Sequence, residues 1–204
     1  QRTIDIMAAF LAEIRDETGA VLEELNLGGG YGVRYTDEDE AINIPARLAE
    51  LAAYLKEETE RLGLPMPRFL MEPGRSIVAD AGMTLYTVGS VKRIPGYKQY
   101  AAVDGGMTDN PRYALYQSRY TVYHAHKSGS MERFDVVGRC CESGDIIQPG
   151  VELPGDTCRG DILAVCTTGA YNYSMASNYN RLPRPAVVML TPDRIYEAVR
   201  RETF

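Results

Sequence analysis

The residues around Gly82 separate two stretches of sequence with different periodicities, and this change constrains the fold more than any other feature. Before Arg75, helical and strand-like patterns alternate along the chain. After Gly82, short strand-like patterns follow one another, separated by turn signals such as Pro95-Gly96, Pro149-Gly150 and Pro154-Gly155. We therefore predict an α/β domain over residues 1–82 and an all-β domain over residues 83–204.

The first domain is predicted to have the order helix, strand, helix, strand. Apolar residues recur at helical spacing from Ile4 to Ile14, and Gly19 is suited to end that helix. Pro45 suits the first turn of a second helix, which Gly63 ends. Strands are predicted over residues 22–27 and 68–71. Because a crossover helix joins them, the two strands are expected to run parallel. A further helix of about two turns is predicted over residues 76–82.

The second domain is predicted to be an antiparallel barrel or sandwich, because short strands separated by turn residues dominate it. The expected strands cover residues 84–94, 100–103, 120–124, 133–137, 161–166 and 186–190. Residues 193–201 are predicted to form a short C-terminal helix, with Thr191 or Asp193 as its cap.

Composition limits the classes of function. The net charge of −6 over 204 residues argues against broad binding to nucleic acid or to an anionic membrane. No apolar run approaches the roughly 20 residues that a membrane span needs. The four cysteines and two histidines lack paired zinc-ligand spacing, so no metal site is expected. Reduced thiols make the cytoplasm the default location. Gln1 begins inside a helical pattern, so we expect a piece of a longer protein.

Two glycine-bearing loops are candidate anion sites, Gly28-Gly29-Gly30 and Glu72-Pro73-Gly74-Arg75. Glycine lets the backbone approach a phosphate and point N–H groups at it, and Arg75 adds a bidentate fork. Each loop alone is more simply an ordinary turn, and neither a dinucleotide fingerprint nor a Walker loop is present. Because both follow predicted parallel strands, whose C-terminal ends gather ligands, together they favour a phosphate site.

The second domain holds three further candidates. Cys141 beside Glu142 could donate a proton, although a buried small cysteine and a solvated turn are the simpler interpretation. Arg112 and Tyr116 lie four residues apart and could hold a carboxylate from one side of a helical turn. Tyr171 follows an apolar strand and could stack on a ligand or donate a hydrogen bond to it. His124 and His126 alternate on a predicted strand, and we expect neither to be catalytic.

Taken in order, these stretches resemble the fold-type III pyridoxal-phosphate amino-acid decarboxylases. The resemblance covers nearly the whole chain, and it implies the last units of a PLP-binding (β/α)8 barrel followed by a C-terminal antiparallel β-barrel domain. It also implies that Gly28, Gly29 and Gly30, with the loop Glu72, Pro73, Gly74 and Arg75, hold the phosphate of pyridoxal 5′-phosphate. Arg75 would in addition meet a substrate carboxylate.

The resemblance implies roles for the candidates of the second domain. Arg112 and Tyr116 would grip the far end of an amino-acid substrate. Cys141 would be the proton donor, and Glu142 the carboxylate that recognises the distal ammonium group. Tyr171 would touch both cofactor and substrate. In this family the cysteine and glutamate reach into the site of the other subunit, so an obligate homodimer with shared active sites is implied.

Within the family, the residues Glu142-Ser143-Gly144-Asp145 after Cys141 resemble the branch that converts meso-2,6-diaminopimelate to L-lysine. Branches acting on ornithine, arginine or carboxynorspermidine stay open, as does a catalytically silent binding homologue. One departure concerns the lysine to which the family attaches its cofactor. None of the four lysines follows an apolar strand beside a phosphate loop. The missing N-terminal half of the barrel is therefore expected to precede Gln1 and to carry that lysine.

Overall fold

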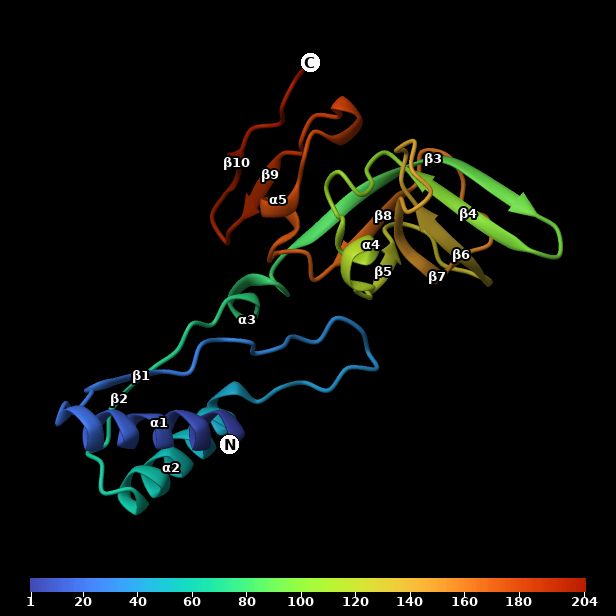
Figure 1. The fold of residues 1–204 in the computed structure, drawn as a ribbon. Helices are drawn as coiled ribbons and strands as arrows, with labels where there is room; N and C mark the ends of the chain where they lie inside the picture. The colour runs from blue at the N-terminus through green and yellow to red at the C-terminus, as the bar shows by residue number, and fades with distance from the viewer. The chain divides into compact units, whose positions relative to one another are not determined.

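The computed structural model describes all residues from 1 to 204, and these form two compact units (Figure 1). Unit 1 comprises Gln1–Val33 and Glu40–Ile77, and unit 2 comprises Arg34–Asp39 and Val78–Phe204. None of the helices combines the length and the apolar character that crossing a membrane requires.

Unit 1 has the predicted order of helices and strands. It contains α1 (Arg2–Thr18), β1 (Glu24–Asn26), α2 (Ile44–Arg61) and β2 (Arg68–Leu70). The two strands pair in parallel, with Leu25 opposite Phe69, which confirms the predicted strand–helix–strand unit. The helix that follows, α3 (Arg75–Val78), has only four residues and is shorter than predicted.

The ends of the two long helices follow the capping residues in the sequence. Gly19 adopts a left-handed conformation with φ of 74°, and its N–H donates to the carbonyl of Arg15 at 2.8 Å. Asn43 caps α2 by accepting a hydrogen bond from the N–H of Ala46. The guanidinium group of Arg15 also donates to the carbonyl of Leu62, which ties the end of α1 to the end of α2.

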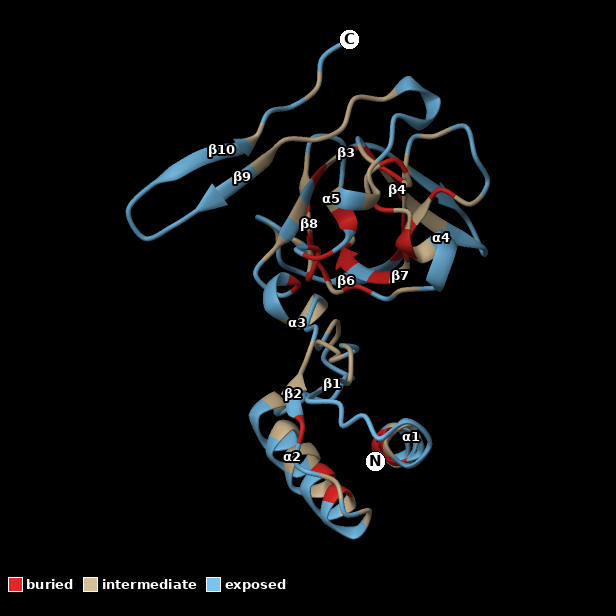
Figure 2. Ribbon diagram, turned by 60° about the vertical axis from the view of Figure 1, so that its left-hand side comes forward, coloured by how far each residue is buried: buried red, intermediate tan, exposed pale blue.

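The core of unit 1 is small. Ile4 and Leu11 of α1 pack with Leu25 of β1 and Leu55 of α2, and all four side chains are buried. Figure 2 shows buried segments on both helices of this unit. Other apolar side chains of α1, notably Ile6 and Phe10, are exposed, so only part of its apolar surface is covered within the unit.

Unit 2 is built on a six-stranded sheet with the strand order β5-β8-β3-β4-β6-β7. The sheet curls into a nearly closed, barrel-like structure, so that the edge strands β5 and β7 contact each other (Figure 2). The pairing is antiparallel except between β4 and β6, which run parallel. The strands are β3 (Met83–Ile94), β4 (Lys98–Val103), β5 (Val122–His124), β6 (Met131–Val137), β7 (Ile146–Pro154) and β8 (Ile162–Cys166).

The inward-facing side chains of these strands form one apolar core. On β8, Leu163 and Val165 are fully buried while their neighbours are only partly so, the alternation expected for a strand with one face inward. The core also includes Tyr86, Val88, Ala101, Val103, Tyr120, Val122, Phe134, Val136, Ile147, Val151 and Leu153. Short helical segments α4 (Arg112–Tyr116), α5 (Asn172–Met175) and η1 (Tyr179–Arg181) lie in the connections.

The sequence does not predict strand β7, because Pro149-Gly150 is typical of a turn. In the structure this dipeptide lies inside the strand, with Gly150 at a φ of 68°. Its pairing with β6 shifts register between Phe134 and Val136, and the carboxylate of Asp135 accepts the N–H of Gly150 at 2.9 Å. A proline and a left-handed glycine are therefore accommodated by an irregularity in the ladder.

The predicted C-terminal helix over residues 193–201 is wrong. The structure has a strand there, β10 (Ile195–Val199), which pairs antiparallel with β9 (Val187–Leu190). The N–H of Thr191 donates to the carbonyl of Arg194, and the Thr191 hydroxyl accepts the N–H of Arg194. Thr191 thus closes a tight turn and does not cap a helix, and Ile195 and Tyr196 suit a strand.

Candidate functional site

The two candidate anion loops of unit 1 lie side by side. Gly28 follows β1 and Glu72 follows β2, so both loops leave the C-terminal ends of the parallel pair. The N–H of Glu72 donates to the carbonyl of Gly28 at 2.8 Å. The side chain of Asn26 joins them further, since its Nδ2 donates to Glu72 Oε1 at 2.6 Å and its Oδ1 accepts the N–H of Gly28 at 2.7 Å.

Glycine is required where the loops approach most closely. A Cβ atom on Gly29 would lie 2.1 Å from the carbonyl oxygen of Glu72, which is far inside van der Waals contact. Gly28 and Gly30 have φ values of 72° and 89°, and the space beside each is open. The result is a stretch of backbone that a small anion can approach without meeting side chains. α3 begins only at Arg75 and makes one turn, so its dipole adds less than the predicted longer helix would.

In unit 2, the structure brings Arg112, Tyr116 and Tyr171 together. Arg112 is 5% exposed, and its Cζ lies 5.2 Å from the centre of the Tyr116 ring and 5.5 Å from that of Tyr171. The predicted pairing of Arg112 with Tyr116 on one side of a helical turn is confirmed by α4. Two aromatic rings in contact with a buried guanidinium group restrict its orientation.

Tyr171 owes its position to the glycine two residues earlier. The N–H of Gly169 donates to the carbonyl of Ala79 at 3.0 Å, and a Cβ there would lie 1.9 Å from the carbonyl oxygen of Val78. Tyr171 itself has a φ of 72°, a strained conformation for a bulky side chain. Outliers of this kind gather at functional sites, where the surrounding structure holds them in place.

Buried polar side chains that the sequence did not suggest surround Arg112. Asn110, Tyr120 and Asn172 are each less than 5% exposed. The amide nitrogens of both asparagines, the Tyr120 hydroxyl and Arg112 Nε make no hydrogen bond of ordinary geometry within the protein. Burial raises the pKa of Tyr120, although Arg112 beside it acts in the opposite direction. Native interiors rarely leave such groups unsatisfied, so the cluster is suited to a polar ligand. The only signal for this cluster in the sequence is that Asn110 lies two residues before Arg112 and that Asn172 directly follows Tyr171.

Cys141 and Glu142 are both exposed, in the loop that leads from β6 to β7. Cys140 is partly buried, and burial, together with the nearby carboxylate of Asp145, raises the pKa of its thiol. The two cysteines thus differ in exposure, and Cys141 is the more accessible of the two. Tyr179 is the neighbour of Glu142, with its hydroxyl 3.4 Å from Glu142 Oε2.

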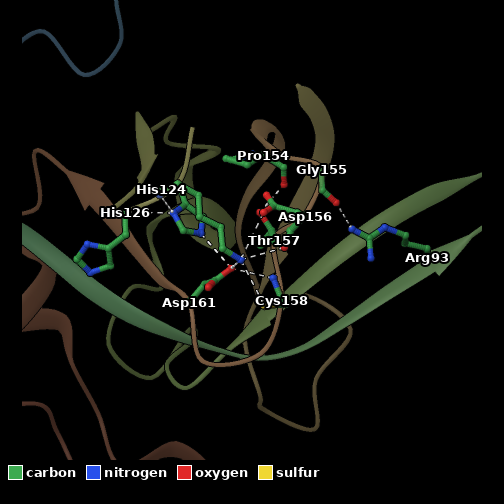
Figure 3. Close-up of polar contacts among 10 residues, drawn as sticks. Arg93, His124, His126, Pro154, Gly155, Asp156, Thr157, Cys158 and Asp161 are labelled. Carbon is green, nitrogen blue, oxygen red and sulfur yellow. Dashed lines mark hydrogen bonds and ion pairs between the residues drawn. The ribbon is translucent and has the colours of Figure 1, made fainter. Parts of the chain in front are cut away.

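His124 belongs to a structural network at the end of β5 (Figure 3). Its Nδ1 accepts the backbone N–H groups of His126 and Lys127, and its Nε2 lies 3.1 Å from Asp161 Oδ2. Lys127 Nζ donates to the same carboxylate oxygen at 2.7 Å. Burial raises the pKa of Asp161, but the hydrogen bonds from Lys127, Cys158 and His124 outweigh burial and lower it overall. β5 ends at His124 and His126 lies beyond it, so the expected alternation of the two histidines on one strand is wrong.

The four lysines are distributed away from the glycine loops along the chain. Lys56 is on α2, Lys92 on β3 and Lys98 at the start of β4, where its Nζ pairs with Asp135 at 2.6 Å. Lys127 takes part in the Asp161 network. None of them follows β1 or β2.

Residues 10–169 match the family model described as the C-terminal sheet domain of pyridoxal-dependent decarboxylases. The diaminopimelate decarboxylase of Bacillus subtilis (strain 168) is 48% identical over 196 residues, which are 95% of this chain and 44% of that protein. The diaminopimelate decarboxylase of Staphylococcus aureus (strain COL) is 42% identical, over 92% of this chain and 45% of its own length.

A solved structure of similar fold is diaminopimelate decarboxylase from M. jannaschii in complex with L-lysine. It has a TM-score of 0.90 and 32% sequence identity, and the match covers 98% of this chain and 45% of that one. The chain therefore spans less than half the length of the relatives that it matches.

Proposed function

Since the chain belongs to the family of pyridoxal-dependent decarboxylases, we propose that its parent protein decarboxylates meso-2,6-diaminopimelate to L-lysine. The identity to diaminopimelate decarboxylases along almost the entire chain supports this substrate. The observation that carries the proposal is the buried Arg112 between Tyr116 and Tyr171, a site suited to hold a carboxylate at one end of a substrate.

The cofactor is pyridoxal 5′-phosphate, and the loops of unit 1 fit its phosphate group. Gly28, Gly29 and Gly30 would offer backbone N–H groups, and Arg75 at the end of the neighbouring loop would add positive charge. When bound, the cofactor supplies the electron sink for the electron pair left by departing CO₂. The chain's own residues have to hold the phosphate, orient the substrate and deliver a proton.

The residues of unit 2 would recognise and protonate the substrate. The guanidinium group of Arg112 would bind the distal carboxylate through paired hydrogen bonds, and the rings of Tyr116 and Tyr171 would orient it and exclude water. The exposed carboxylate of Glu142 would pair with the distal ammonium group. The thiol of Cys141 would hold the proton that is transferred to the carbon from which CO₂ has left.

The proposed domain organisation follows the family. Residues 1–82 would be the last units of a PLP-binding (β/α)8 barrel, and residues 83–204 the β-barrel domain that completes the enzyme. The parallel pair β1–β2 and the nearly closed sheet of unit 2 support this assignment. The rest of the barrel would supply the lysine that anchors the cofactor. The protein would act in the cytoplasm as a homodimer, with Cys141 and Glu142 serving the partner's site.

Comparing kcat/KM for meso-diaminopimelate and for L-ornithine in the full-length protein tests this proposal. A site that pairs polar groups rejects an analogue lacking them by about 10⁴-fold, so diaminopimelate should be preferred by that order. The Arg112→Lys variant keeps the charge but loses the planar fork, and most of the preference should disappear. Arg119→Lys, which changes an exposed arginine paired with Glu38, is the matched control. Equal kcat/KM values for the two amino acids in the wild type would refute the proposal.

A further inference from the structure

Asp145 links two loops of unit 2 through its carboxylate. Its Oδ1 accepts the backbone N–H of Met107 at 2.6 Å, and its Oδ2 accepts the backbone N–H of Cys140 at 2.6 Å. The residue is 4% exposed. Both hydrogen bonds are short for N–H···O contacts, so the carboxylate holds the two backbone segments closely.

The surroundings of the carboxylate are shaped to fit it. A Cβ atom on Gly106 would lie 2.6 Å from Asp145 Oδ1, and one on Gly138 would lie 2.2 Å from Oδ2. Both glycines therefore leave the space that the carboxylate occupies. The backbone adds two further links, from the N–H of Gly138 to the carbonyl of Asp145 and from the N–H of Arg139 to the carbonyl of Gly105.

Each of the two loops leads to a residue of the proposed site. On one side, Cys140 immediately precedes Cys141 and Glu142. On the other, Met107 lies in a turn in which the N–H of Asn110 donates to the carbonyl of Gly106, and Arg112 follows two residues later. Asp145 thus joins the segment of the proposed proton donor to the segment of the proposed carboxylate grip.

We propose that Asp145 is a positioning residue, which fixes the Cys141–Glu142 loop relative to the segment that carries Arg112. The catalytic part of this inference rests on the proposed function. Asparagine in place of Asp145 has nearly the same shape. However, only one of its two terminal atoms, the amide oxygen, can accept a hydrogen bond from a backbone N–H. Its NH₂ group would face the N–H of either Met107 or Cys140, so one of the two links is lost without creating a cavity.

The test uses the full-length holoenzyme with Asp145→Asn, and Asp156→Asn as a matched control on an exposed turn. Misplacement of a reacting group by about 1 Å costs on the order of 10²-fold in rate, so kcat should fall by that order in Asp145→Asn. KM should rise as well, because the same loop carries Glu142, whose carboxylate is proposed to bind the distal ammonium group. The absorbance of the bound cofactor should be unchanged, and Asp156→Asn should behave like the wild type.

A second readout does not depend on turnover. Iodoacetamide alkylation of Cys141, followed by mass spectrometry relative to the exposed Cys158, reports the environment of the loop. Amide hydrogen exchange at Met107 and Cys140 reports the two bonds directly. In Asp145→Asn the ratio of Cys141 to Cys158 alkylation should change several-fold, and one of the two amides should exchange faster. A loss of global stability alone would leave the alkylation ratio of the folded protein unchanged.

Four outcomes decide the inference. An unchanged alkylation ratio and unchanged exchange in folded Asp145→Asn would overturn it, as would changed readouts with an unchanged kcat. If the wild type does not act on diaminopimelate, the proposed function fails, while alkylation and exchange still decide whether Asp145 fixes the loop. If Asp145→Asn does not fold, amide hydrogen exchange in the wild type decides the inference. Fast exchange of the Met107 and Cys140 amides would exclude a fixed link through Asp145.

Discussion

Arg112 shows how one residue is prepared for binding. A buried guanidinium group is costly unless it is paired, and here two aromatic faces and the sulfur of Met175, 3.7 Å from Nη1, surround it. Its Nε makes no hydrogen bond within the protein. A carboxylate that reaches it would therefore meet a donor fork whose orientation is already fixed, so that ordering the Arg112 side chain would cost little entropy on binding.

Cys141 and Cys140 give a direct test of the proton donor. Cys141→Ala should lower kcat by about 10²–10⁴-fold, the usual contribution of a positioned acid, without changing the absorbance of the bound cofactor. Cys140→Ala should have a small effect on kcat, because Cys140 is partly buried and burial raises the pKa of its thiol. Steady-state rates of the two full-length variants provide the measurement. A larger loss of kcat in folded Cys140→Ala would reverse the assignment.

At this scale the sequence predicts contacts between near neighbours and misses those between distant segments. The pairing of Arg112 with Tyr116 follows from helical spacing, and it is present. The arrival of Tyr171 at the same guanidinium group depends on the turn at Gly169, and no local pattern encodes that approach. The contacts of Asp145 with Met107 and Cys140 are likewise tertiary, although Gly106 and Gly138 mark the places where the chain makes room.

At the scale of secondary structure, the C-terminal hairpin β9–β10 is held at its far end by Glu202. Its carboxylate accepts hydrogen bonds from the N–H of Arg184 at 2.9 Å, from Arg184 Nε at 2.7 Å and from Asn178 Nδ2 at 2.7 Å. The hydrogen bond from Arg184 is the main reason that the pKa of Glu202 is lowered to about 2. Glu202 therefore ties the end of the chain to the segment before β9.

The lowered pKa of Glu202 predicts a pH dependence. Because its folded pKa lies below the unfolded value, its stabilisation is complete above the unfolded pKa, near 4.5, and is lost as the pH falls toward about 2. The Tm of Glu202→Gln should thus be below that of the wild type at pH 6, and the difference should shrink as the pH is lowered below 4.5. Circular dichroism of the full-length proteins measures this. Glu152→Gln, on the exposed face of β7, is the control, and a Tm difference independent of pH would contradict the prediction.

The elements that were predicted correctly have strong local signals. α1 and α2 combine an apolar face with the end signals Gly19, Pro45 and Gly63, so the sequence indicates where α1 ends and where α2 begins and ends. β7 and β10 could not be found in the same way. The turn residues inside β7 are tolerated because β6 shifts its register, and β10 is defined by its pairing with β9, which a single segment does not reveal.

At the scale of the whole molecule, unit 1 contains surface that suits further elements. β1 and β2 form a two-stranded parallel sheet, so each strand keeps one unpaired edge. On α1, Ile6 and Phe10 are 59% and 51% exposed. These features support the proposal that unit 1 is part of a larger barrel, whose remaining strands and helices would cover them.

Residues 1–204 alone should therefore release no CO₂ from meso-diaminopimelate in the presence of pyridoxal phosphate. Catalysis by this cofactor needs an anchoring lysine, and Lys56, Lys92, Lys98 and Lys127 are engaged elsewhere or lie on other elements. A ¹⁴CO₂-release assay measures activity, and visible absorbance measures attachment of the cofactor. The full-length Bacillus subtilis relative is the positive control. Visible absorbance of an attached cofactor together with CO₂ release would show that the chain carries its own anchor.

The order β5-β8-β3-β4-β6-β7 also determines when the sheet can form during translation. β3 ends at Ile94 and pairs with β8, which ends at Cys166, so roughly 70 residues must be added after β3 before its partner is complete. At roughly 5–20 residues per second this takes about 4–14 s. Throughout that time one edge of β3 is unpaired on the nascent chain and can bind other strands or chaperones. The last strand to leave the ribosome among these six is therefore the one that joins β5 to β3.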